Sequence, residues 1–316
     1  MLKNALKGFS MGIAEVIPGV SGGTIAFITG IYEQLLDSLG ALPAALPLIF
    51  RGQFKNFAQK INFFFLLQLG LGMVLGIGFG VAVVTNLMET QPLLLWAFFF
   101  GLIFSSVIYL GKQISWNLTS TVTGLVGLGI GAWFSFAGTG AGSDSLIFIF
   151  FSGVLAISAL ILPGVSGSFL LLLLGMYHRI IPAVKGLMSN PSAEGFTILI
   201  TFGAGCLIGL FSFAKVVSFT FKKWKFPTMS AMVGLMLGSL AKIWPWQEVI
   251  ATRVNSLGEL KASLTAPVLP STFESLESNL NYGNDPKIIA VIITMLVGFG
   301  VVQCFDLWEK RKSKLA

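Results

Sequence analysis

Long apolar stretches alternate with short polar segments along the whole chain. Between Lys60 and Lys112 the only charged residue is Glu89, and between Asp144 and Arg179 there is no Asp, Glu, Lys or Arg. About 20 apolar residues suffice to cross the hydrocarbon core of a bilayer. The pattern therefore predicts an all-α polytopic membrane protein. Its apolar segments are 8–32, 61–86, 92–111, 118–138, 145–177, 196–220, 227–246 and 288–305.

Two of these segments contain the same five residues, Pro-Gly-Val-Ser-Gly, at 18–22 and again at 163–167. At that offset of 145, Gly30 also matches Gly175 and Tyr32 matches Tyr177. Proline has no amide donor and adjacent glycines weaken a helix, so each motif favours a break in the middle of an apolar stretch. Each motif segment is therefore either one interrupted span or a hairpin that dips into the membrane and returns.

The distribution of cations helps to choose between these two alternatives, because cytoplasmic loops are enriched in Lys and Arg. The cationic segments are 3–7, 51–60, Lys112, 222–225 and 310–314. If neither motif segment crosses the membrane, all of them lie on the cytoplasmic side together with both termini. The segment 247–287 then lies outside, and Arg179 and Lys185 are the exceptions to the rule.

A motif hairpin followed by three spans makes an odd number of crossings, so a second copy starts from the other side of the bilayer. The sequence thus predicts two inverted repeats, as in many secondary transporters. The first is 1–138 with its motif at 8–36, and the second is 139–316 with its motif at 145–181 and an extracytoplasmic loop at 247–287. That loop is rich in Ser, Asn, Pro and Glu, and we expect one short helix in it, near 273–280.

A broken helix at membrane depth leaves backbone groups unpaired, which is tolerated only inside protein or beside a watery cavity. The half-helix after each break presents amides and the positive end of its dipole, and these suit an anion. The predicted substrate-binding residues at the motifs are Gly19, Ser21, Gly22, Gly23, Thr24, Gly164, Ser166, Gly167 and Ser168. The alternative is a tight turn in which each serine only caps its own helix.

Glu15 lies three residues before the first motif, in an apolar setting, and Leu160 is its counterpart before the second. An ionisable residue inside a membrane segment indicates function. Glu15 can couple transport to a gradient by exchanging a proton, or it can pair with a cation such as Lys215 or Lys242. A structural glutamate held by a salt bridge is the remaining alternative.

Arg179 follows the second motif, and arginine offers planar two-point recognition of a phosphate group. It is a candidate for binding a lipid headgroup, or else an interfacial anchor. Lys215 and Lys242 are the only cations within predicted spans, where they can bind a headgroup, pair with a carboxylate or reach the interface through their long stems.

Composition excludes several classes of function. Charged residues make up 10% of the chain, against about 25% in soluble domains. The net charge of +7 collects in short loops, where it sets orientation rather than nucleic-acid binding. With one His and two Cys, the chain offers no metal site, no cofactor site and no clustered nucleophile and base. We therefore expect a protein that is not an enzyme.

Three sequence features together resemble one prokaryotic membrane family: the segment 14–24, the second motif at 163–167, and the run from Gly234 to Trp246. The family is known as domain of unknown function 368, the undecaprenyl phosphate transporters. The resemblance implies a flippase of the cytoplasmic membrane that returns the 55-carbon lipid carrier to the cytoplasmic leaflet for peptidoglycan and other envelope polymers.

The resemblance implies membrane lipids as partners, and proton or sodium coupling is the expectation drawn from Glu15. The sequence does not indicate an oligomeric state. A channel or exchanger for a small anion, built on the same half-helices, is the competing hypothesis.

Overall fold

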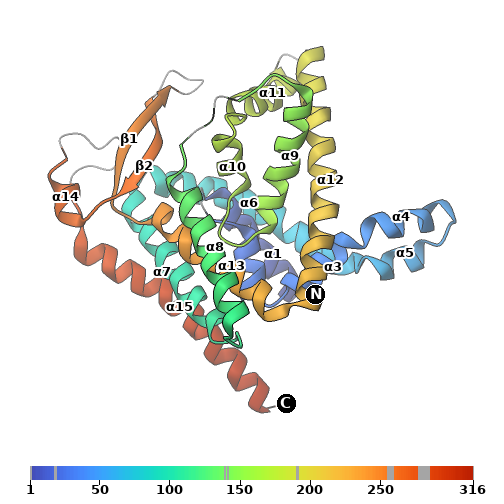
Figure 1. Cartoon of the computed structure of the whole chain (residues 1–316), viewed down its shortest axis with the longest axis horizontal. Coiled ribbons are helices and arrows are strands. Elements are labelled where there is room, and N and C mark those ends of the chain that lie inside the picture. Colours follow the sequence, from blue (N-terminus) through green and yellow to red (C-terminus); the bar gives the residue numbers. More distant parts are fainter. Residues whose placement is uncertain are drawn as a thin grey trace. The chain divides into compact units, whose positions relative to one another are not determined.

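The computed structural model describes residues 2–17, 20–138, 140, 142–189, 192–254, 260–276 and 285–315. The chain forms two compact units, shown with their helices and strands in Figure 1. Unit 1 comprises Met1–Val81 and Thr139–Lys225, and unit 2 comprises Ala82–Gly138 and Phe226–Ala316. Each unit thus draws on both predicted repeats. The repeats, 1–138 and 139–316, are divisions of the sequence and stay a prediction.

Unit 1 is helical throughout its described residues. Its elements are α1 (Leu2–Val16), α2 (Gly22–Ile28), α3 (Tyr32–Gly40), α4 (Leu42–Phe50), α5 (Phe54–Lys60), the first part of α6 (Phe63–Thr90), α9 (Leu146–Ile161), α10 (Gly167–Leu173), α11 (Tyr177–Ser189) and α12 (Ala193–Lys223). The segment 35–50 is divided between α3 and α4, two helices of nine residues each.

Among the described residues, five helices are long and apolar enough to cross a membrane: α6, α7 (Pro92–Gly111), α8 (Leu118–Phe136), α12, and α13 (Lys225–Ser239) with its short continuation to Ile243. They coincide with five of the six simple spans predicted from the sequence. The sixth is α15 (Ile288–Leu315), whose apolar part is Ile288–Cys304.

The internal repeat is visible in the bounds of the helices. Adding 145 to the end of α1, to both ends of α2 and to the start of α3 gives the end of α9, both ends of α10 and the start of α11. Gly30 and Gly175 both end the short helix with φ of +69°, and in both copies the amide of this glycine and that of the next residue donate back to carbonyls of that helix. This is the Schellman ending, which needs a residue free to adopt positive φ.

The chain reverses at each motif. In the first copy, the amide of Gly22 meets the side chain of Glu15, and Lys7 Nζ donates to the carbonyl of Thr29 at 2.6 Å. In the second, the amide of Gly140 donates to the carbonyl of Leu173 at 2.6 Å. Each short helix therefore runs back along the helix before it. We call residues 2–28 hairpin 1 and residues 146–173 hairpin 2.

Each hairpin packs on one long helix through matching glycines. Gly72 of α6 lies directly against the backbone of Ala5, and Gly205 of α12 lies in the same way against Phe150, the equivalent position. A side chain at either glycine would collide with backbone. Small residues let membrane helices approach this closely. The equivalent glycines therefore give α6 and α12 the same packing against their hairpins.

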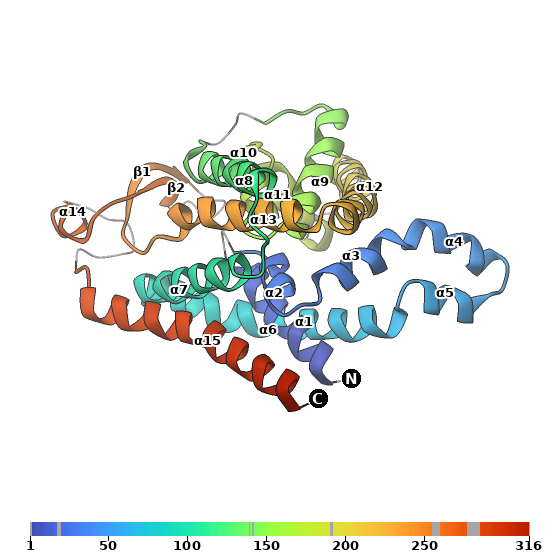
Figure 2. The same ribbon diagram turned by 60° about the horizontal axis from the view of Figure 1, so that its bottom comes forward.

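Unit 2 is built on two helix pairs, and each pair joins one helix from either half of the chain. Its elements are the end of α6, α7, α8, α13, the 3-10 helix η1 (Leu240–Ile243), β1 (Gln247–Val254), β2 (Leu260–Pro267), α14 (Pro270–Glu274) and α15. Gly101 of α7 touches the backbone of Met295 on α15, and Gly234 of α13 touches that of Gly124 on α8. The two views of Figures 1 and 2 show α7 beside α15.

The segment 247–287 differs from the expectation of a loop with one short helix. Strands β1 and β2 pair antiparallel, with Gln247 opposite Pro267. The helix α14 overlaps the start of the predicted position, whose second half, 277–280, lies outside the described residues. Phe273 of α14 is fully buried and packs with Trp246 and Leu93, so the insertion is anchored to unit 2 by a small apolar core of its own.

Candidate functional site

The tips of the two hairpins meet inside unit 1. The hydroxyl of Ser21 donates to the carbonyl of Leu160 at 3.0 Å. The amide of Gly164 donates to the hydroxyl of Thr24, also at 3.0 Å. Ser21 and Thr24 are fully buried, so these bonds form away from solvent, where a buried polar group needs a partner. The two motifs, 145 residues apart in sequence, form one structural element.

Close backbone approach depends on glycine at one point in this contact. Gly23 lies directly against the carbonyl of Ile161, with no room for a Cβ. The hydroxyl of Tyr32, a fully buried side chain, donates to the same carbonyl at 3.1 Å. Sequence reasoning did not give Tyr32 a role, although the Tyr32 and Tyr177 match in the repeat was a signal for it.

Glu15 accepts a hydrogen bond from the amide of Gly22 at 2.6 Å. The next amide, that of Gly23, donates to the hydroxyl of Ser21 at 3.1 Å, and that of Thr24 donates to the Ser21 carbonyl at 2.9 Å. The first amides of α2 are therefore all satisfied within hairpin 1. A carboxylate is the natural acceptor at the positive end of a helix, and Glu15 fills that position.

Hairpin 2 has the same bounds but a different cap. Leu160 stands where hairpin 1 has Glu15, and the hydroxyl of Ser166 pairs with that of Ser168 at 2.9 Å instead of capping α10. Among the described residues, the amides of Gly167 and Ser168 have no acceptor. The two tips thus differ in whether their helix starts are occupied.

The tips bring together most of the predicted motif residues: Glu15, Ser21, Gly22, Gly23, Thr24, Gly164, Ser166, Gly167 and Ser168. Gly19 lies outside the described residues. The three predicted cations lie elsewhere. Lys215 is exposed on α12, Lys242 is half-buried in η1 of unit 2, and Arg179 is on α11.

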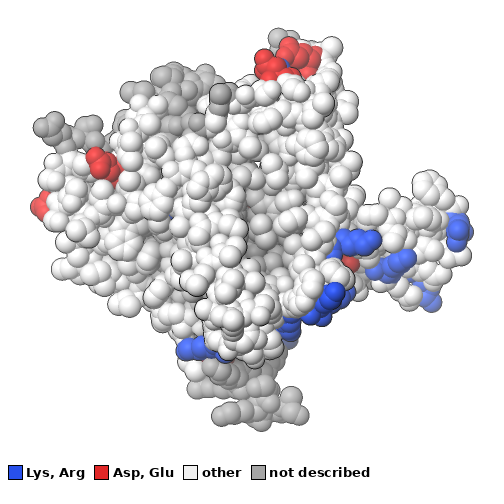
Figure 3. All heavy atoms as spheres, in the orientation of Figure 1, with Lys and Arg blue, Asp and Glu red and all other residues white. Residues whose placement is uncertain are grey.

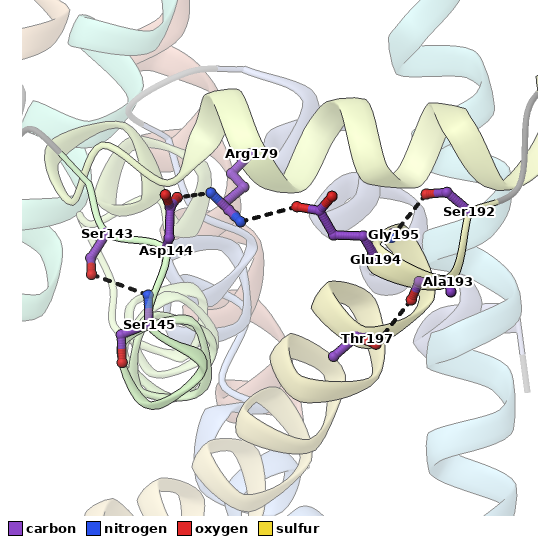
Figure 4. Close-up of polar contacts among 9 residues, drawn as sticks. All are labelled: Ser143, Asp144, Ser145, Arg179, Ser192, Ala193, Glu194, Gly195 and Thr197. Atoms are coloured by element: carbon purple, nitrogen blue, oxygen red, sulfur yellow. Dashed lines mark hydrogen bonds and ion pairs between the residues drawn. The ribbon is translucent and has the colours of Figure 1, made fainter.

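Arg179 forms ion pairs with two carboxylates, as Figure 4 shows. One is Asp144, just before α9, and the other is Glu194, in the first turn of α12, at 3.3 Å. Nothing local in the sequence groups these three residues, because 35 positions separate Asp144 from Arg179. Their ion pairs attach α11 to the segment before α9 and to the beginning of α12.

The helix that follows hairpin 1 is attached to the other end of α12. Lys222 of α12 pairs with Asp37 of α3 at 2.6 Å, and Lys225 pairs with Glu33 at 3.2 Å. The hydroxyl of Ser218 also donates to Asp37. The helices that follow the two hairpins, α3 and α11, are therefore tied to opposite ends of α12.

Comparison with known proteins gives matches over most of the chain. A family described as undecaprenyl phosphate translocase-like matches residues 11–261. A polyprenyl-phosphate transporter of Vibrio cholerae is 40% identical over 282 residues, covering 88% of each chain. One of Staphylococcus aureus is 33% identical over 255 residues, covering 77% of this chain and 86% of the relative. No solved structure matches. The chain belongs to the undecaprenyl phosphate translocase-like family.

Proposed function

We propose that the protein moves a polyprenyl monophosphate between the leaflets of the cytoplasmic membrane, with undecaprenyl phosphate as the cargo. The observation that carries this proposal is the meeting of two broken hairpins at their tips, joined by the Ser21 to Leu160 and Thr24 to Gly164 bonds. Paired breaks at the junction of two repeats are where transporters bind their substrates. The names of the two relatives supply the class of substrate.

The orientation of α12 supports an inverted arrangement of the hairpins. Its 31 residues measure about 46 Å at 1.5 Å per residue, close to the full thickness of a bilayer with its headgroups. Lys222 and Lys223 lie at its end, which the positive-inside rule places in the cytoplasm. In Figure 3, one cluster of acidic side chains lies where α12 begins, and most of the basic side chains of unit 1 lie at its opposite end.

On this orientation, hairpin 1 enters from the cytoplasmic side and hairpin 2 from the outer side. Both are then re-entrant, the repeats are inverted, and the N-terminus is cytoplasmic because Lys7 lies beside Thr29 at the open end of hairpin 1. The C-terminal cations at 310–314 place that end in the cytoplasm by the same rule.

The best hydrogen-bond donors for the phosphate group lie at hairpin 2. Among the described residues the amides of Gly167 and Ser168 have no acceptor, and the hydroxyls of Ser166 and Ser168 stand beside them. At hairpin 1 the equivalent amides are occupied by Glu15 and Ser21. Protonation or displacement of Glu15 frees the amide of Gly22 for the same phosphate, which links translocation to a proton, or to another cation that neutralises the carboxylate.

The test is a leaflet-resolved assay of undecaprenyl phosphate in liposomes that contain the purified protein. We expect the protein to move the lipid from the outer leaflet to the cytoplasmic leaflet, the direction that supplies envelope polymer synthesis. Chloride flux is measured in the same liposomes, because a small-anion channel is the competing function. Chloride flux without lipid movement would replace the present proposal with that alternative.

A further inference from the structure

A cavity of about 450 Å³ lies between α11 and the first turns of α12, away from the hairpin tips. Its size falls in the range of about 300 to 1,000 Å³ usual for small-molecule sites. Its lining includes the polar residues Arg179, Ser192 and Glu194 and the apolar residues Pro182, Leu187 and Phe196. A cavity lined by both charged and apolar side chains suits an amphiphile with an ionic head.

Arg179 is the lining residue that favours a negatively charged ligand. Its two terminal nitrogens contact Asp144 and Glu194, while its Nε–H is buried and has no acceptor among the described residues. Figure 4 shows the guanidinium held between the two carboxylates. A buried donor without an acceptor is costly, so the guanidinium has capacity for one more oxygen ligand.

The two carboxylates are easily replaced. The side chains of Asp144 and Glu194 are 85% and 76% exposed, whereas that of Arg179 is 29% exposed. Exposed ion pairs are worth little, since water solvates the released carboxylates well. A phosphate monoester carries more charge than a carboxylate and binds a guanidinium through two parallel hydrogen bonds. The beginning of α12, a helix of 31 residues, adds the positive end of its dipole.

We infer that this cavity is a second binding site for a phosphate monoester, in which the phosphate replaces Asp144 and Glu194 on Arg179 and an isoprenoid tail lies along Leu187 and Phe196. The inference rests on the proposed function, because the orientation of α12 puts the cavity at the outer surface. The site there receives the headgroup before it reaches the hairpin tips, and its occupation breaks the ion pair between Arg179 of α11 and Glu194 of α12.

The experiment uses a cysteine placed in the cavity wall. Gly186 lines the cavity, and a Cβ built on it meets no atom within 4 Å. The variant Gly186→Cys is made in a background with Cys206→Ala and Cys304→Ala, and the rate of maleimide labelling is measured. Gly111→Cys, at the end of α7, is the matched control because a Cβ there is equally unobstructed. The probes are farnesyl phosphate, farnesol and inorganic phosphate.

We expect farnesyl phosphate to slow labelling at position 186 but not at 111, with farnesol and inorganic phosphate far weaker. The half-protecting concentration is the concentration of farnesyl phosphate that halves the labelling rate at position 186. Arg179→Ala raises it roughly tenfold or more, as expected for the loss of charge-assisted hydrogen bonds. Glu194→Gln lowers it about two- to fivefold, since an exposed competitor is removed. Asp37→Asn, which breaks the ion pair at the other end of α12, leaves it unchanged.

Equal labelling rates with and without farnesyl phosphate, in protein that still moves polyprenyl phosphate in liposomes, would overturn the cavity site and leave the proposed function standing. Equal protection by inorganic phosphate would overturn the lipid assignment. If Arg179→Ala does not fold, Arg179→Lys replaces it. Lysine keeps the charge but loses two-point recognition, so it must also raise the half-protecting concentration if the site is correct.

Discussion

Hairpin 1 and hairpin 2 share a backbone but not a cap. Both break after the same helical position, restart at equivalent glycines and end with a glycine at φ of +69°. In hairpin 1, however, the side chain of Glu15 accepts a hydrogen bond from the amide of Gly22, whereas hairpin 2 has Leu160 at the position of Glu15. The breaks and glycines that the fold requires are therefore present in both hairpins, whereas the carboxylate proposed for coupling is present in one.

The largest expected effect comes from making hairpin 1 resemble hairpin 2. Glu15→Leu leaves the amide of Gly22 without its acceptor, which costs about 1 to 3 kcal/mol of stability, and removes the carboxylate proposed to couple transport. We expect transport to fall more than tenfold and the melting temperature to drop, measured by leaflet-resolved assay and thermal shift.

The matched control for that change is Glu15→Gln. Its amide oxygen still accepts from Gly22, so the protein keeps its melting temperature while transport remains low. Normal transport by Glu15→Gln at normal expression would remove the charge of Glu15 from the mechanism.

The converse change gives hairpin 2 the cap of hairpin 1. Leu160→Glu places a carboxylate near the amides of Gly167 and Ser168, where it competes with the substrate phosphate. We expect a several-fold loss of transport and weaker protection by polyprenyl phosphate. Leu160→Met conserves volume without adding charge and should transport normally. Unimpaired binding by Leu160→Glu would mean that hairpin 2 does not hold the phosphate.

The contact between the tips is tested by removing one shared hydroxyl. Thr24→Val keeps the shape but leaves the amide of Gly164 unpaired in a buried position, at a cost of about 1 to 3 kcal/mol. The melting temperature should fall, while Thr24→Ser should restore it. Identical melting temperatures for the Val and Ser variants would show that the bond contributes nothing.

The serines at the two tips should differ in the property that they change. Ser21→Ala loses a hydroxyl that both donates to Leu160 and accepts from Gly23, so it lowers stability. Ser166→Ala loses only a pairing with Ser168 and should weaken phosphate binding instead, by about 1.5 to 3 kcal/mol for a charge-assisted bond. Isothermal titration with a short-chain polyprenyl phosphate measures the affinity of each variant. If Ser166→Ala binds this lipid as tightly as the unchanged protein does, only backbone donors remain to hold the phosphate at hairpin 2.

The repeat, the helix breaks and the main spans could be predicted from the sequence because they depend on local chemistry. Proline and glycine set the breaks, and the runs without charge set the spans. The same local rules left two alternatives for the motif segments. The contacts of Gly22 with Glu15 and of Lys7 with Thr29 show that the chain reverses there.

The partners of the site residues could not be predicted, since they are distant in sequence. Nothing local links Thr24 to Gly164 or Arg179 to Asp144. The strands β1 and β2 were missed because the polar composition of 247–287 hid a weak alternation of side chains. Their pairing is stabilised by the buried cluster around Trp246 and Phe273, which tertiary structure alone creates.

The pairing of helices from the two halves of the chain in unit 2 affects the order of folding. Gly101 of α7 lies against the backbone of Met295 on α15, and the hydroxyl of Ser105 donates to the carbonyl of Phe299, 194 positions later. Contacts between residues so far apart in sequence form slowly, because a long loop must close first. The packing of α7 on α15 should therefore be a late step in folding, after the local helical contacts have formed.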